Sequence, residues 1–219
     1  MADALKYAAV AVLAGLIALL CIGVFKPAGR PYVLLVGDSI SECYASGVAE
    51  KLGDRYRVGI IQENGRSTRI LLEHLDEWVI SEKPDIVVLN AGLHDIAFRS
   101  DGPVPLDEYE KNLTEIVRRI KAGTGARVIW ATTTPVIDEV HFFVHGFVRR
   151  EKDVVRYNEA SLRVMKALRV QVVDLHAVVI AADPAKLYED GLHPDPRGSA
   201  LLADAVAKAV TGSTARWDR

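Results

Sequence analysis

The sequence has little cysteine and almost no excess charge of either sign. Its 219 residues include two cysteines, Cys21 and Cys43, and the net charge is −2. Cys21 lies in an apolar segment outside the expected folded domain, so no disulfide is available within that domain and the redox compartment stays open. A nearly neutral chain gives no sign of a nucleic-acid partner. We find neither an internal repeat nor a low-complexity segment.

An uncharged apolar segment, residues 7–25, lies between Lys6 and Lys26. As a helix it would be roughly 28 Å long, close to the thickness of a bilayer's hydrocarbon core. The segment is long for a signal peptide, and no small-x-small cleavage site follows it. We therefore expect a single-pass membrane anchor, with the folded domain outside the cytoplasm, or secretion if residues 1–30 are removed. The flanking charges barely specify the orientation.

These features divide the chain into an anchor and linker (1–30), a folded domain (31–212) and a tail (213–219). About 190 residues, half of them hydrophobic, suit one domain of ordinary size. Short apolar segments alternate with helical ones along this domain, which predicts a parallel sheet with helices on both faces, a three-layer α/β/α sandwich. The expected elements are strands at 33–36, 56–61, 86–89, 127–132 and 170–175, helices at 40–52, 68–80, 106–121, 151–168 and 197–210, an irregular segment at 136–150, and a loop at 182–195.

A serine stands where the first predicted strand gives way to a helix. The turn Gly37-Asp38-Ser39 would lie at the carboxyl edge of the sheet, where open α/β folds place their ligands. The start of the next helix favours negative charge on a nearby oxygen. Taken alone, the turn is more typical of an ordinary helix cap, and only the other loop motifs favour a nucleophile; we expect Asp38 to be structural.

Serine becomes a nucleophile only when a correctly oriented base removes its proton. His193 can be that base, and Asp190, three residues earlier, can orient its ring across the tight turn that Gly191 permits. Acyl transfer also needs hydrogen-bond donors for an oxyanion. The backbone N–H groups of Ser39 and Gly65 are candidates, and a third donor could come from residues 92–95.

Together these motifs resemble the SGNH (GDSL-type) hydrolases over about residues 32–210. The family's motifs match Gly37-Asp38-Ser39, Gly65, and Asp190 with His193, and Thr134-Pro135 is also similar to the family. The resemblance implies a flavodoxin-like, five-stranded sandwich and ester or thioester hydrolysis without a metal or other cofactor. It also implies an acyl intermediate on Ser39 and favours a short acyl group, such as O-acetyl on a carbohydrate.

The third motif departs from this family. An asparagine that donates to the oxyanion is usual where His94 stands. Imidazole can also donate an N–H. We therefore expect His94 to supply the third donor, with Asn90 as the alternative. Because histidine titrates near neutrality, we also expect a pH dependence that an amide would not show.

Other interpretations stay open. A lipid esterase or thioesterase would suit the apolar segment and the phenylalanine-rich segment 141–147. That segment is equally suited to line a substrate pocket or touch a membrane, and to pack on the sheet. An inactive glycan-binding member and an acyltransferase are further alternatives. Asp138, His141 and His145 lack the glutamate of a zinc-protease motif, so we expect no metal. We expect Arg149 and Arg150 to be solvated, and Asp174 and His176 to shape their loop.

Overall fold

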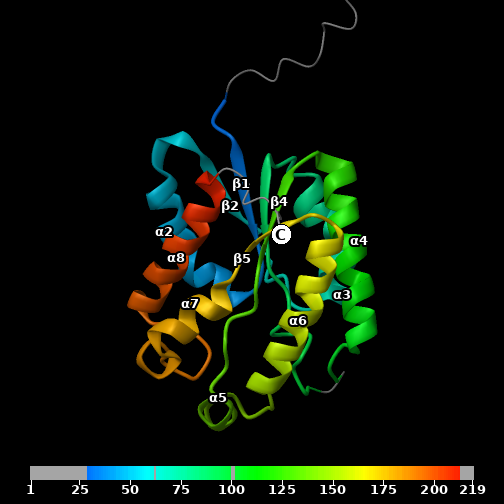
Figure 1. Cartoon of the computed structure of the whole chain (residues 1–219). Coiled ribbons are helices and arrows are strands. Elements are labelled where there is room, and N and C mark those ends of the chain that lie inside the picture. Colours follow the sequence, from blue (N-terminus) through cyan, green and yellow to red (C-terminus); the bar gives the residue numbers. More distant parts are fainter. Residues whose placement is uncertain (1–28, 62, 100–101, 213–219) are drawn as a thin grey trace, which may run out of the picture. The chain divides into compact units, whose positions relative to one another are not determined.

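The computed structural model describes residues 29–61, 63–99 and 102–212. From Pro31 onward the chain forms a compact unit built on a five-stranded parallel sheet with the strand order β2-β1-β3-β4-β5 (Figure 1). The strands are β1 (Tyr32–Val36), β2 (Arg57–Ile60), β3 (Ile86–Leu89), β4 (Arg127–Ala131) and β5 (Gln171–Val173). This confirms the predicted flavodoxin-like sandwich.

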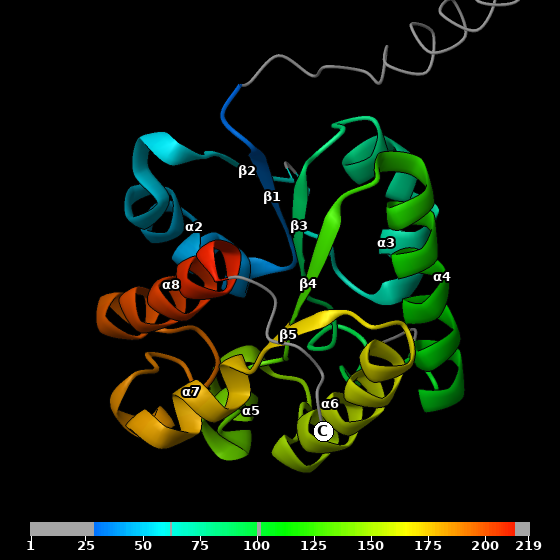
Figure 2. The same ribbon diagram turned by 45° about the horizontal axis from the view of Figure 1, so that its top comes forward.

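Helices cover both faces of the sheet, as Figure 2 shows from a second direction. On one face lie α2 (Ser39–Leu52), α7 (Leu175–Ala182) and α8 (Pro196–Thr211). On the other lie α3 (Thr68–Glu73), α4 (Leu106–Thr124) and α6 (Glu151–Ala167). The helix α5 (Asp138–His145) lies beyond the carboxyl ends of the strands. Short helical turns complete the unit: η1 (Gly53–Arg55), η2 (Asp76–Ile80) and η3 (Pro184–Lys186).

The burial of the strands explains their composition. Every residue of β1 and β3 is buried, because helices pack on both faces, and both strands are therefore continuous apolar runs. In α4 the buried side chains recur three or four residues apart, from Tyr109 to Ile120, so one stripe of the helix faces the sheet. Gly125, with a φ of 71°, ends that helix in the left-handed conformation that glycine adopts without strain.

Two helices lie where none was predicted. The first, α5, falls in the segment 136–150 that we expected to be irregular, and the second, α7, follows a strand that ends earlier than expected. Each has eight residues, too few to be stable without tertiary contacts. The predicted helix 68–80 is also divided, since α3 ends at Glu73 and a π-helical turn follows.

The predicted anchor at 7–25 lies outside the described residues, as does the tail from residue 213. Within the part of the chain that the structure describes, no helix is both long enough and apolar enough to cross a bilayer.

One buried hydrogen bond lets the core be tested. The indole N–H of Trp130, on β4, donates to Ser161 Oγ at 3.1 Å, and both residues are fully buried. Ser161→Ala leaves this donor without a partner, so we expect a loss of about 1–3 kcal/mol in the free energy of unfolding, measured by urea denaturation. The matched control is Ser46→Ala on the exposed face of α2, expected within about 0.5 kcal/mol of the parent. Equal stabilities for the two variants would contradict this account of the core.

Candidate active site

Three side chains that are distant in the sequence meet at the carboxyl edge of the sheet. Ser39 Oγ lies 2.9 Å from His193 Nε2, and His193 Nδ1 lies 2.6 Å from the Oδ2 atom of Asp190. Because Nδ1 faces a carboxylate, it carries the ring proton, which leaves Nε2 to accept from the serine hydroxyl. The structure therefore brings together the three residues that the sequence singled out.

The turn that holds Asp190 and His193 depends on Gly191. Asp190 Oδ1 accepts hydrogen bonds from the backbone N–H groups of Leu192 and His193, at 3.0 and 2.7 Å. Gly191 has a φ of 80°, and a Cβ atom there would lie 2.7 Å from the backbone nitrogen of His141. Burial alone would raise the pKa of Asp190, but the hydrogen bonds from His193 lower it to about 2. The carboxylate is therefore ionised at neutral pH.

Ser39 is the first residue of α2, and Asp38 caps that helix. The Oδ1 atom of Asp38 accepts the N–H of Ile40 at 3.0 Å, the geometry of an ordinary helix cap. Asp38 is buried, its Oδ2 atom has no hydrogen-bond partner among the described residues, and burial raises its pKa. Asp38 thus has the local structural contact that we expected, and it orients the turn that presents Ser39.

Gly65 packs directly against the serine turn. Its N–H donates to the carbonyl of Gly37 at 2.9 Å, and a Cβ on Gly65 would lie 2.9 Å from that same oxygen. Only glycine allows so close an approach of the two backbones. In this structure the N–H predicted to face an oxyanion is therefore bonded to the neighbouring loop.

His94 lies on the turn after β3 and is partly buried. Burial, together with Arg149, Arg99 and Arg66, lowers its pKa to about 4. This value favours a neutral ring with one N–H to donate at neutral pH, in place of the expected titration near neutrality. The alternative donor, Asn90, uses one amide N–H to bind the carbonyl of Ala131 at 2.9 Å.

Asp95, next to His94, connects two of the loops. Its Oδ1 atom accepts from both the backbone N–H and the hydroxyl of Thr68, at 2.9 and 2.6 Å. The Asp95 side chain thus binds the start of α3, which follows Gly65. Burial raises the pKa of Asp95 to about 7.

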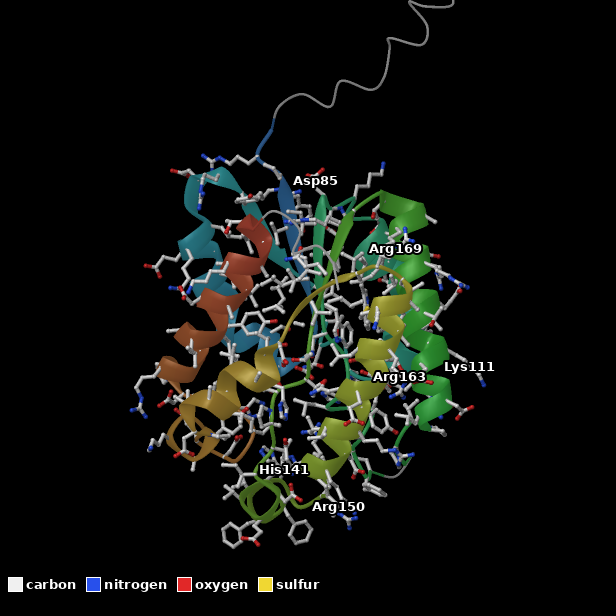
Figure 3. All side chains as sticks on the ribbon, viewed as in Figure 1. Asp85, Lys111, His141, Arg150, Arg163 and Arg169 are labelled. Carbon is white, nitrogen blue, oxygen red and sulfur yellow. The ribbon has the colours of Figure 1, made fainter. Side chains whose placement is uncertain are left out.

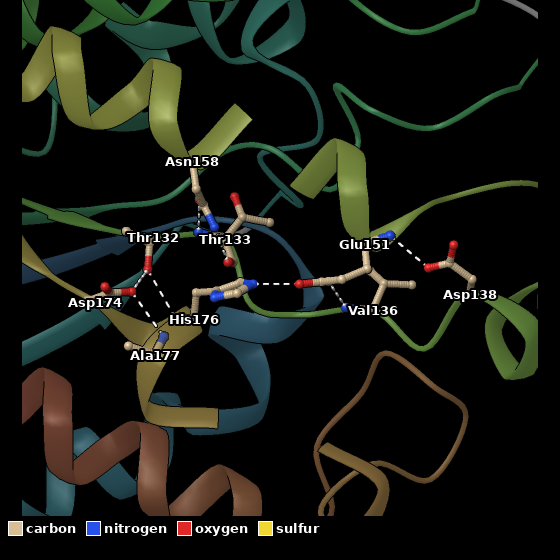
Figure 4. Close-up of polar contacts among 9 residues, drawn as sticks. All are labelled: Thr132, Thr133, Val136, Asp138, Glu151, Asn158, Asp174, His176 and Ala177. Carbon is tan, nitrogen blue, oxygen red and sulfur yellow. Dashed lines mark hydrogen bonds and ion pairs between the residues drawn. The ribbon is translucent and has the colours of Figure 1, made fainter. Parts of the chain in front are cut away.

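A further cluster of hydrogen-bonded residues holds the segment that follows β4 in place (Figure 4). His176 Nε2 lies 2.6 Å from Glu151 Oε1, and Glu151 Oε2 accepts the N–H of Val136 at 2.8 Å. The hydroxyl of Thr132 donates to Asp174 at 2.9 Å, and the side chain of Asp174 caps α7. Asp174 and His176 thus shape the loops around them, as predicted.

One contact at the centre of the site was not predicted from the sequence. His145 Nε2, on α5, lies 3.0 Å from the same Asp190 oxygen that binds His193. Its neighbour His141 is buried and accepts from Arg149 Nη1 at 3.2 Å; Figure 3 labels His141 in the α5 region. Arg149 is only 4% exposed, so the expectation that it is solvated is wrong. The spacing of His141 and His145 was the available signal, since residues four apart share one helix face, whereas Arg149 lies beyond the end of α5.

His145, Asp190 and His193 offer three possible metal-ligand atoms within 4.8 Å of one another. Their separations of 3.0 and 2.6 Å from the shared carboxylate oxygen are those of hydrogen bonds. The other candidate metal ligands from the sequence make different contacts; they are Asp138, His141 and His145. Asp138 accepts the N–H of Glu151 at 2.7 Å, and His141 faces the Arg149 cation.

Several known proteins and one family profile resemble this chain in sequence. The sequence profile of the GDSL-like Lipase/Acylhydrolase family matches residues 35–201. The chain is 30% identical over 194 residues to the isoamyl acetate-hydrolyzing esterase 1 homolog of Mus musculus, covering 78% of each. It is 27% identical over 215 residues to an acetylxylan esterase of Geobacillus stearothermophilus, covering 81% of this chain and 93% of that one.

Solved structures share the fold. The crystal structure of an acetyl xylan esterase matches with a TM-score of 0.70 at 20% identity, covering 82% of this chain and 99% of that one. The crystal structure of the G. stearothermophilus acetylxylan esterase matches with a TM-score of 0.68 at 22% identity, covering 88% and 100%. With the family profile matching most of the chain, these findings show that the protein belongs to the GDSL-like lipase/acylhydrolase family, the SGNH hydrolases, and is an ester-hydrolysing enzyme.

Proposed function

We propose that this enzyme is a serine esterase that removes short acyl groups, O-acetyl in particular, from a carbohydrate. The observation that carries the proposal is the hydrogen-bonded chain from Ser39 Oγ through His193 to Asp190. Two of the relatives are named acetylxylan esterases, and another is named for isoamyl acetate, so acetate esters recur among them. An intact chain of this kind argues against an inactive glycan-binding member.

In this mechanism Ser39 Oγ attacks the ester carbonyl while His193 Nε2 removes the hydroxyl proton. Asp190 stabilises the imidazolium that forms. When the tetrahedral intermediate collapses, the C–O bond to the alcohol breaks, and His193 returns the proton to that leaving oxygen. Water then attacks the acyl-serine by the same steps and releases the acid. An acyltransferase would differ only in using a second alcohol in place of water.

The oxyanion needs donors placed before the reaction starts. The Ser39 N–H, at the first position of α2, is not used by the helix's own hydrogen bonds, and the helix dipole there favours negative charge. The neutral ring of His94 is our proposed side-chain donor. Gly65 can be a further oxyanion donor only by sharing its N–H between the Gly37 carbonyl and the oxyanion.

A lipid or thioester substrate is the second candidate, and one observation favours it. Helix α5 exposes Val140, Phe142, Phe143 and Val144, and Phe143 is 90% exposed. An apolar surface of this kind suits a lipid or a membrane. We also propose that residues 7–25 anchor the enzyme in a membrane with this domain outside the cytoplasm, or that the domain is secreted if residues 1–30 are removed.

Substrate choice separates these candidates. With p-nitrophenyl esters of increasing chain length, we expect kcat/KM to be highest for acetate, and we expect acetate release from acetylated xylo-oligosaccharides. Ser39→Ala should lower kcat by about 10³-fold or more, because the members of a triad act as a unit. Ser46→Ala, on the same helix, is the control. A preference for long acyl chains would favour the lipid candidate, and undiminished turnover by Ser39→Ala would exclude the mechanism.

The neutral state of His94 leads to a pH prediction. Replacing it by alanine should lower kcat by about 10²-fold, the usual effect of removing one oxyanion donor. His94→Asn keeps an N–H donor and should restore most of the rate. Because the pKa of His94 is about 4, the ratio of kcat/KM between the parent and His94→Asn should stay constant from pH 6 to pH 9. A ratio that changes near pH 6.5 would show that the ring titrates in the usual range.

A further inference from the structure

We propose that His145 is a positioning residue of this active site, acting through Asp190 by holding the carboxylate that orients His193. The inference rests on the proposed function, since it concerns how the Ser39 mechanism is controlled. The contact that carries it is the hydrogen bond from His145 Nε2 to Asp190 Oδ2, at 3.0 Å.

This contact completes the hydrogen bonding of the carboxylate. Asp190 Oδ1 accepts two backbone N–H groups, and Oδ2 accepts one ring N–H from His193 and one from His145. A carboxylate offers about four acceptor sites, so each is used. With a donor on every site, the carboxylate has no freedom to rotate away from His193.

The ring of His145 is itself held in place. It stacks on His141, with 4.6 Å between the ring centroids, and its edge approaches Phe147 at 6.2 Å. Helix α5 is attached to the Asp190 turn, because the N–H of Ile137 donates to the carbonyl of Gly191 at 2.8 Å. The helix and the turn therefore form one packed unit, and the His145 contact is built into it.

The buried cation Arg149 keeps His141, the ring stacked on His145, neutral. Arg149 donates to the carbonyl of Leu93 through Nε at 2.7 Å, and to His141 through Nη1. Burial and this guanidinium lower the pKa of His141 to about 4. Its Nε2 accepts from Arg149, so His141 presents an uncharged ring to His145. These contacts connect the loop that carries His94 to His193. They pass through Arg149, the two stacked histidines of α5 and Asp190.

Sharing Oδ2 between two rings has an electrostatic consequence. The negative charge of Oδ2 is shared between the ring N–H groups of His193 and His145, so removing the His145 donor leaves that charge facing His193 alone. The charged and titratable groups around this pair are Asp190, Asp38, Arg149 and His141, with Arg99 lying over the ring of Phe147.

The test uses two substitutions that differ in one donor. His145→Phe keeps an aromatic ring to stack on His141 but has no N–H, whereas His145→Gln has an amide N–H that reaches a similar position. For His145→Phe we expect kcat on p-nitrophenyl acetate to fall by about tenfold with KM within about twofold. We also expect the acid limb of its kcat/KM profile to move up by about half a pH unit. His145→Gln should stay within about threefold of the parent, with its acid limb unmoved.

Glu139→Gln, at another exposed position on α5, is the matched control and should behave as the parent does. His145→Met replaces the phenylalanine variant if the latter does not fold, as judged by its thermal unfolding. The proposal would be overturned if His145→Phe kept the parent's kcat and the parent's acid limb. Equal losses of kcat in His145→Phe and His145→Gln would also overturn it. Ser39→Ala, assayed alongside, separates this failure from failure of the proposed function, which Ser39-independent turnover would indicate.

Discussion

The site depends on the single carboxylate of Asp190. The positive φ of Gly191 turns the backbone so that Asp190 accepts the N–H groups of Leu192 and His193 while its second oxygen faces the His193 ring. That ring in turn meets Ser39. Because the turn packs against the backbone of α5, both the orientation of the His193 ring and the contact with His145 follow from one local conformation.

The loops at this edge of the sheet are joined to one another by hydrogen bonds. The Gly65 N–H binds Gly37, Asp95 binds Thr68, and Arg149 connects the loop after β3 to α5. Such connections matter for catalysis, because donors that are already in place do not have to reorganise as charge develops. The rigid parallel sheet supplies a common edge, and these contacts align the loops on it.

Two buried carboxyl groups are incompletely satisfied in this region. Asp38 and Asp95 each have one oxygen with no hydrogen-bond partner among the described residues, and burial raises the pKa of both. Unsatisfied buried polar atoms are unfavourable for stability, and functional sites are where such exceptions are expected. Here they stand beside Ser39 and beside His94, so the polarity that orients the site is also a local weakness of the fold.

The sequence by itself determined the five strands, the sandwich, and the identities of Ser39, Asp190 and His193, because apolar periodicity and short loop motifs are local signals. It did not determine α5 and α7, since eight-residue helices depend on tertiary contacts. The burial of Arg149, the low pKa of His94 and the contact between His145 and Asp190 were likewise decided by the tertiary structure. Desolvation and long-range hydrogen bonds depend on which side chains packing brings together, and spacing along the chain does not specify that.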